Sequence, residues 1–326
     1  MTAVILTIAA VCMVLVAFWY SCGNILYYLA FGRLDKEAEA NRTRNSAKKN
    51  VLERRPESIS ISGWNISGES VYIESRDGIK LHARAFMQKS GKWVLVAHGY
   101  RDEASEMLWA AKEFYTMGYS VLIPDARGHG GSGGNYIGMG WPERYDLLDW
   151  IEKIVDIDDD AQIVMFGWSM GGATVMMTSG ENLPANVKAI VEDAGYTSVQ
   201  EILKYRLSHF FKSGAGPIVY IMAGAVSHVI KRRAGYSLDK ASAVNQIKKS
   251  ITPTLFIHGD ADLTVPVDMV YKNYESAKCE KELYILKNIA HSRGIGVDLE
   301  DYWRRVDDFI SKYVRQNSLL TKGKYE

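Results

Sequence analysis

The chain has 326 residues, enough for one large domain or two small ones with a buried core. Its 39 Lys and Arg nearly balance its 38 Asp and Glu, and a formal net charge of +1 gives no indication of a nucleic-acid or polyanion partner. The three cysteines, Cys12, Cys22 and Cys279, do not form a disulfide framework, and two of them lie in the apolar N-terminal segment.

Residues 1–32 contain no Lys, Arg, Asp or Glu and include the nearly continuous apolar run AVILTIAAVCMVLVAFWY. About 20 such residues in a helix cross the hydrocarbon core of a bilayer, and aromatic side chains such as Trp19 and Tyr20 favour its interface. A cleaved signal peptide is the alternative, but no basic residue opens the segment and residues 30–32 make a poor cleavage site. We therefore predict an uncleaved, single-pass anchor in the cell membrane over residues 1–32.

Residues 33–68 are polar and dense in charge, which predicts a juxtamembrane linker. Basic side chains follow the anchor from Arg33 onward and none precedes it, so the positive-inside rule predicts that the downstream domain faces the cytoplasm. The glycosylation sequons at Asn41 and Asn65 would matter only if this segment were translocated in a glycosylating cell.

A globular pattern begins at about residue 69. Two alternating segments flank Asp77-Gly78, which is a hairpin signal. Short continuous apolar runs follow, and they are typical of strands covered on both faces of a parallel sheet. These runs are residues 93–99, 119–126, 161–167, 187–195, 253–260 and 282–288. Segments with helical spacing accompany them at 104–118, 142–155 and 301–314. The alternation predicts an α/β fold over 69–326: a mostly parallel, eight-stranded sheet with helices on both faces.

One interval, between the runs at 187–195 and 253–260, holds about 55 residues, far more than a single crossover helix requires. Its apolar middle portion is too short and too often broken by glycine to span a bilayer. We predict a helical cap insertion at about 196–248 that lies over one end of the sheet. Two ordinary packing helices of a larger core are the alternative.

The stretch GWSMG, residues 167–171, places Ser169 between glycines at a strand-to-helix turn. A serine on so sharp a turn crowds the residues two positions away, which must therefore be small. Its hydroxyl stands clear of the sheet near the positive end of the following helix. This is the context of a nucleophile, although G-x-S-x-G also occurs by chance.

A serine nucleophile needs a base and an acid that orients the base. His291 lies in a loop after the last strand-like run, and Asp262 follows the preceding run. The chain order Ser169, Asp262, His291 is the order that a catalytic triad has on a sheet of this type. Asp193 and Asp260 remain alternatives for the acid. His129 precedes the nucleophile strand, so we assign it a structural role.

The chain from about residue 69 onward resembles the α/β-hydrolase family of serine hydrolases, and within it the bacterial membrane-anchored esterase- and lipase-like members. The resemblance is carried by HGYRDE, DARGHGGSGG, GWSMGG and HGDADLTVP, in this order along the chain. It favours Asp262 as the acid, and it implies an oxyanion hole made by the backbone N–H groups of Met170 and Tyr100.

Other motifs indicate no metal and no cofactor. The glycine-rich run at 125–134 lacks the Lys-Ser/Thr of a phosphate-binding loop. His98 and His258 are predicted to brace loop backbones, since no cluster has the spacing of metal ligands. The acidic run at 156–160 lacks the glycine and the distant glutamate of a calcium loop.

These features predict a hydrolase that cleaves carboxylic esters through an acyl-serine, with a small-molecule ester as its substrate and the membrane as its other partner. The apolar insertion would suit an acyl or aromatic ester chain through Phe210, Phe211, Tyr220 and Met222. A thioesterase or peptidase that uses the same three residues is one alternative. A catalytically silent scaffold tethered to the membrane is another.

Overall fold

The structure is a computed structural model that describes residues 1–33, 68–211, 216–291 and 297–315. The predicted linker lies outside the described residues except at its two ends, and so do Asn41 and Asn65. All of the strand-like runs identified in the sequence lie within the described part of the chain.

The centre of the molecule is an eight-stranded sheet with the order β1-β2-β4-β3-β5-β6-β7-β8. Its strands are β1 (Glu69–Glu74), β2 (Lys80–Phe86), β3 (Lys92–Ala97), β4 (Ser120–Pro124), β5 (Gln162–Trp168), β6 (Val187–Asp193), β7 (Thr254–Gly259) and β8 (Lys281–Leu286). β2 pairs antiparallel with β1 and β4, and all other pairs are parallel. The predicted hairpin, mostly parallel sheet and strand number are therefore confirmed.

Helices cover both faces of this sheet. They are α3 (Leu108–Thr116), preceded by the short 3-10 helix η1 (Ala104–Met107), α4 (Glu143–Ile157), α5 (Met170–Ser179), α8 (Ala243–Ile247), α9 (Asp268–Ser276) and α10 (Leu299–Ile310). Successive residues of β3 point to opposite sides: Val94 packs with α3 and α10, whereas Leu95 packs with α4. Burial on both faces explains why the strands read as continuous apolar runs.

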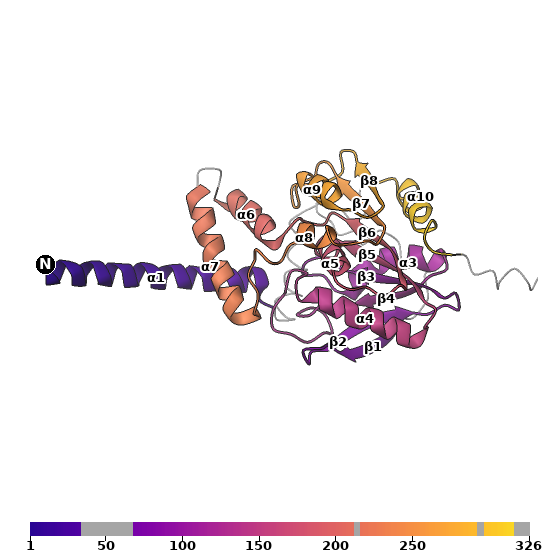
Figure 1. Cartoon of the computed structure of the whole chain (residues 1–326), viewed down its shortest axis with the longest axis horizontal. Helices are drawn as coiled ribbons and strands as arrows, with labels where there is room; N and C mark the ends of the chain where they lie inside the picture. Colours follow the sequence, from indigo (N-terminus) through magenta and orange to yellow (C-terminus); the bar gives the residue numbers. More distant parts are fainter. Residues whose placement is uncertain (34–67, 212–215, 292–296, 316–326) are drawn as a thin grey trace, which may run out of the picture.

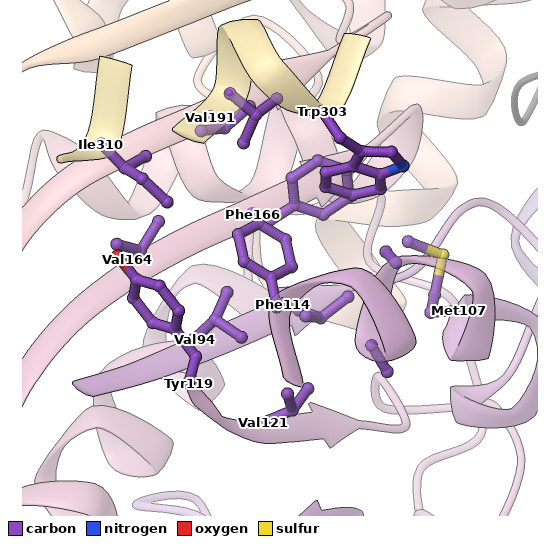
Figure 2. Close-up of a cluster of buried hydrophobic side chains, with 14 of the residues drawn as sticks. Val94, Met107, Phe114, Tyr119, Val121, Val164, Phe166, Val191, Trp303 and Ile310 are labelled. Carbon is purple, nitrogen blue, oxygen red and sulfur yellow. The ribbon is translucent and has the colours of Figure 1, made fainter. Parts of the chain in front are cut away.

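Aromatic rings fill the core on the side of α3 and α10 (Figure 2). Phe166 of β5 meets Phe114 of α3 edge-on at a centroid distance of 5.4 Å, and Trp303 of α10 meets Phe114 at 5.3 Å. Pairs with this geometry add to the stability that burial of their apolar area already provides. The elements before and after the insertion are thus joined in one core.

The N-terminal helix α1 (Thr2–Phe31) projects away from the sheet, and the N-terminus is at its free end (Figure 1). It is long and apolar enough to cross a membrane by length and composition. Its buried residues are Gly23, Tyr27 and Phe31, spaced four apart on one face near its C-terminal end. The rest of the helix, from Met1 to Phe18, is exposed.

The interval between β6 and β7 holds α6 (Val199–Phe210), α7 (Gly216–Ala234) and α8. In Figure 1, α6 and α7 stand off from the sheet and α7 crosses beside α1, whereas α8 lies within the body. Ser198 and Ser242 cap α6 and α8 by accepting the N–H groups of Glu201 and Asn245. Val199 and Ile202 pack with Met170, so α6 lies over the end of the sheet where Ser169 is located.

Candidate active site

Ser169 lies at the turn between β5 and α5, in a backbone conformation that residues other than glycine rarely adopt (φ +57°, ψ −115°). Such a conformation costs on the order of 1–3 kcal/mol, which the surrounding structure must offset. A Cβ at Gly171 would lie 2.0 Å from the carbonyl oxygen of Ala97, and one at Gly167 would lie 2.2 Å from that of Gly171. The two glycines are therefore required by the close backbone approach at this turn.

The structure brings Ser169, His291 and Asp262 into one chain of hydrogen bonds. His291 Nε2 lies 2.9 Å from Ser169 Oγ, and His291 Nδ1 lies 2.6 Å from Asp262 Oδ2. The three residues come from the loops after β5, β8 and β7, which all end at the carboxyl edge of the sheet. Ser169 is buried but reaches a cavity described below.

The loop after β7 holds Asp262 as a carboxylate. Its Oδ1 accepts the N–H groups of Thr264 at 2.7 Å and Val265 at 2.9 Å. Burial raises the pKa of Asp262, but hydrogen bonds from His258 and His291 outweigh that effect and hold the pKa well below its usual range. An ionised Asp262 only accepts, so His291 Nδ1 carries a proton and Nε2 is left to accept the Ser169 hydroxyl.

Neither alternative aspartate contacts His291 through a hydrogen bond. Asp193 ends β6 and accepts the hydroxyl of Tyr302 at 2.9 Å, while burial raises its pKa to about 6. Asp260 accepts the N–H of Asn288 and so links the loops after β7 and β8. Asp260 therefore shapes the loops beside the site.

His98 and His129 brace the loop after β3. Nε2 of His98 accepts the N–H of Ala126, and Nε2 of His129 accepts the N–H of Arg101. Burial lowers the pKa of His129 to about 3, so this ring is neutral at physiological pH. Both nitrogens of His129 are used in loop contacts, since Nδ1 bonds to the carbonyl of Arg127.

The loop after β3 also places Tyr100 beside Ser169. Tyr100, Ser169 and Met170 line the same cavity. Met170 is the first residue of α5, where the N–H groups have no carbonyl partner within the helix. The hydroxyl of Tyr100 donates to the carbonyl of Ala30 in α1 at 2.8 Å.

The cavity at Ser169 has a volume of about 410 Å³, within the range of ligand sites in proteins. Apolar side chains from α1, α6 and the loops at the carboxyl edge of the sheet form most of its wall. Among the lining residues that the structure describes, Arg206 is the one charged residue and none is Asp or Glu. Phe210 lines the cavity, whereas Phe211, Tyr220 and Met222 are not among its lining residues. Over the residues that the structure describes, no group of three or more His, Cys, Asp or Glu is arranged to hold a metal ion.

Comparisons with known proteins agree with this geometry. Residues 88–235 match the model of the serine aminopeptidase S33 family of hydrolases. The chain has the α/β-hydrolase fold, and its residues 88–235 belong to this family of hydrolases. It is 27% identical over 218 residues to the uncharacterized protein YqkD of Bacillus subtilis, which covers 67% of this chain and 70% of that protein.

Two further similar proteins are named for an enzymatic activity. The chain is 26% identical over 205 residues to a monoacylglycerol lipase of Mycolicibacterium smegmatis, across 53% of this chain and 71% of the lipase. Its fold matches that of the Pyrococcus furiosus esterase Pf2001 with a TM-score of 0.62 and 24% identity, over 77% of this chain and 94% of the esterase. The esterase shows the fold, whereas the family match and the likeness to the lipase identify the chain as a hydrolase.

Sequence reasoning missed the contribution of α1 to the site. Leu26, Leu29, Ala30 and Phe31 line the cavity at Ser169, although they precede that serine by more than a hundred residues. One signal was present: α1 has 30 residues, whereas about 20 are enough to cross a bilayer. The surplus at its C-terminal end is the part that packs against the hydrolase domain.

Proposed function

We propose that this hydrolase cleaves carboxylic esters, with Ser169 as the nucleophile, His291 as the general base and acid, and Asp262 as the carboxylate that orients the imidazole. The observation that supports this most directly is the chain of two hydrogen bonds, 2.9 and 2.6 Å long, that joins the three side chains. It combines with a serine in a strained backbone conformation that lines an apolar cavity.

In the acylation step, Ser169 Oγ attacks the carbonyl carbon of the ester and forms a C–O bond, while its proton passes to His291 Nε2. The tetrahedral intermediate then expels the alcohol, which takes that proton from the imidazolium. Asp262, held ionised by the N–H groups of Thr264 and Val265, stabilises the imidazolium between these two transfers.

In the deacylation step, a water molecule gives a proton to His291 and attacks the acyl carbon. Collapse of the second intermediate returns the proton to Ser169 and releases the carboxylic acid. We assign the stabilisation of both oxyanions to the backbone N–H groups of Met170 and Tyr100. Each such donor typically contributes about 3–4 kcal/mol to lowering the barrier.

The lining of the cavity favours an ester with an apolar acyl group over an aminopeptidase substrate. A free amino terminus is an ammonium ion, and its recognition in a buried site requires a carboxylate partner. Within the described parts of the chain, the lining residues include Arg206 and no Asp or Glu. The chain also resembles a monoacylglycerol lipase and an esterase, and both names describe ester cleavage.

We assign the enzyme to the membrane, with α1 as a single-pass anchor and the hydrolase domain on the cytoplasmic side. The support is the length and apolar composition of α1 together with the basic residues that follow it in the sequence. Fusion of a reporter to each end of the full chain, followed by protease protection in vesicles, tests both the span and the orientation.

Labelling by a fluorophosphonate probe tests the mechanism. The wild-type full chain should be labelled and should hydrolyse p-nitrophenyl esters, whereas Ser169→Ala should lose labelling and at least about four orders of magnitude in kcat/KM. Ser179→Ala is the matched control, since Ser179 is also a buried serine and belongs to the same helix–strand unit. A folded wild type that resists the probe would favour the scaffold alternative.

A further inference from the structure

The wall of the cavity at Ser169 has two long components. On one side, Leu26, Leu29, Ala30 and Phe31 of α1 line it. On the other side, α6 lines it with residues spaced three and four apart: Val199, Ile202, Leu203, Arg206, Leu207 and Phe210. This spacing defines one face of α6 over its whole length, about 17 Å for 12 residues. The cavity therefore extends from Ser169 along a groove between two helices.

The end of α1 is fixed to the hydrolase domain by hydrogen bonds at successive residues. Tyr100 Oη donates to the carbonyl of Ala30 at 2.8 Å, and the Arg101 guanidinium donates to that of Leu29 at 2.6 Å. The N–H of Ile137 donates to the carbonyl of Phe31 at 2.7 Å. These contacts hold the α1 wall in register with the loop that carries Tyr100.

Further along α1, the contacts with α7 show where the helix leaves the domain. The indole N–H of Trp19 donates to the carbonyl of Ile221, and Arg233 donates to Tyr28 and Asn24. Toward the N-terminus from Trp19, α1 is exposed on all sides up to Met1. A membrane crossed by this exposed part would have its surface near Trp19, an aromatic residue suited to the interface.

The outer ends of α6 and α7 lie toward this same level, and they expose apolar side chains. Ile221 contacts Trp19 directly and is 52% exposed, Ile218 is 49% exposed, and Phe210, the last residue of α6, is 78% exposed. Phe210 also lines the cavity. In Figure 1, α6 leads outward from the sheet toward the side on which α1 projects. The far end of the groove therefore lies toward the level at which a membrane crossed by α1 would have its surface.

We propose that α1 is one wall of the acyl-binding site, and that the substrate is a fatty acyl ester dissolved in the same bilayer. Its chain enters between Leu26 and Phe210 and lies along the groove, with the ester carbonyl at Ser169. An apolar chain that moves from lipid into an apolar groove is never exposed to water, so access from the membrane avoids that cost. This inference rests on the proposed esterase function and adds its substrate class.

A tryptophan placed in the wall tests the role of α1. Leu29→Trp should narrow the groove and lower the ratio of kcat/KM for p-nitrophenyl laurate to kcat/KM for p-nitrophenyl acetate at least tenfold. Leu15→Trp is the matched control, because Leu15 is on the same helix and is 60% exposed, against 63% for Leu29. The control should change neither value, with the full chain reconstituted in phosphatidylcholine vesicles.

A second pair of variants tests access from the membrane without altering α1. Phe210→Asp should raise KM for the laurate ester in vesicles severalfold, with a smaller change in kcat, and should affect laurate hydrolysis more than acetate hydrolysis. Ile251→Asp is the control: Ile251 is 91% exposed and lies just before β7, at the opposite edge of the sheet from Ser169.

The fluorophosphonate probe separates the possible failures. Two outcomes would overturn the role of α1 and leave the esterase intact, provided that Ser169 is labelled at the wild-type rate. In one, Leu29→Trp lowers kcat/KM equally for both esters. In the other, neither Leu29→Trp nor Phe210→Asp lowers kcat/KM for either ester. If the probe does not label Leu29→Trp, that variant does not test the inference, and the comparison of Phe210→Asp with Ile251→Asp decides. A wild type that is neither labelled nor active would remove the proposed function, and this inference with it.

Discussion

Two neighbouring strands of the sheet each have an aspartate at or shortly after their carboxyl end, yet the two carboxyl groups have opposite environments. Asp193 is the last residue of β6, and Asp262 lies three residues beyond the end of β7. Both are buried. Burial raises the pKa of Asp193 to about 6, whereas the pKa of Asp262 is well below its usual range.

The difference comes from the hydrogen-bond donors that each loop provides. Asp262 is followed by Leu-Thr-Val, and its side chain accepts the N–H groups two and three residues later, as aspartate often does at a turn. It also receives His291 Nδ1–H. Asp193 receives one tyrosine hydroxyl, from Tyr302. A buried carboxylate is thus fit to orient a base only when its own loop folds donors around it.

The largest expected effect separates the two aspartates by activity. Asp262→Asn should lower kcat/KM by about four orders of magnitude, since an amide allows the wrong tautomer of His291. Asp193→Asn should retain at least a tenth of the wild-type value. Hydrolysis of p-nitrophenyl acetate measures both variants, and the assignment of the acid would be reversed if Asp193→Asn were the weaker enzyme.

The pH dependence of stability should separate them next. The folded pKa of Asp193 is raised, so its contribution to the free energy of unfolding is present below the usual value of 3.8 and is lost as the pH rises through about 6. Asp193→Asn should remove this loss, which is on the order of 3 kcal/mol. Urea unfolding of the full chain in detergent at several pH values measures it.

Asp262 should behave in the opposite sense in the same experiment. Its folded pKa is lowered, so its contribution is present above the usual value and is lost as the pH falls below it. Asp262→Asn should therefore lower the free energy of unfolding at neutral pH. The variant should also lack the increase in stability that the Asp262 carboxylate gives the wild type between acid and neutral pH. Parallel pH profiles for the two variants would contradict the assigned environments.

The smallest expected effect concerns Tyr302, which donates to Asp193. Tyr302→Phe keeps the ring and removes the hydroxyl that donates at 2.9 Å, which should cost about 1–3 kcal/mol of unfolding free energy at neutral pH. The cost should shrink below about pH 5, where a protonated Asp193 no longer needs the donor as strongly. A cost that does not depend on pH would indicate lost packing instead.

Much of the fold could be predicted from local sequence pattern. Each continuous apolar run became a strand, and Asp77-Gly78 became a hairpin turn with Gly78 at φ +80°. The strained turn at Ser169 was also predictable, because the contacts that require glycine there are short-range. Gly167 approaches the backbone of Gly171, and Gly171 approaches the end of the adjacent strand β3. The insertion was predicted as helical, but its sequence did not indicate that α8 packs into the body while α6 and α7 stand off.

The sequence by itself determined the sheet, the position of the serine and the chain order of the residues that join it, because these depend on short-range patterns and on the direction of strands. Only the tertiary structure decided that α1 reaches the cavity at Ser169. This outcome depends on contacts such as that of Tyr100 with Ala30, 70 residues apart. An apolar residue in an anchor looks the same in sequence whether it faces lipid or a substrate groove.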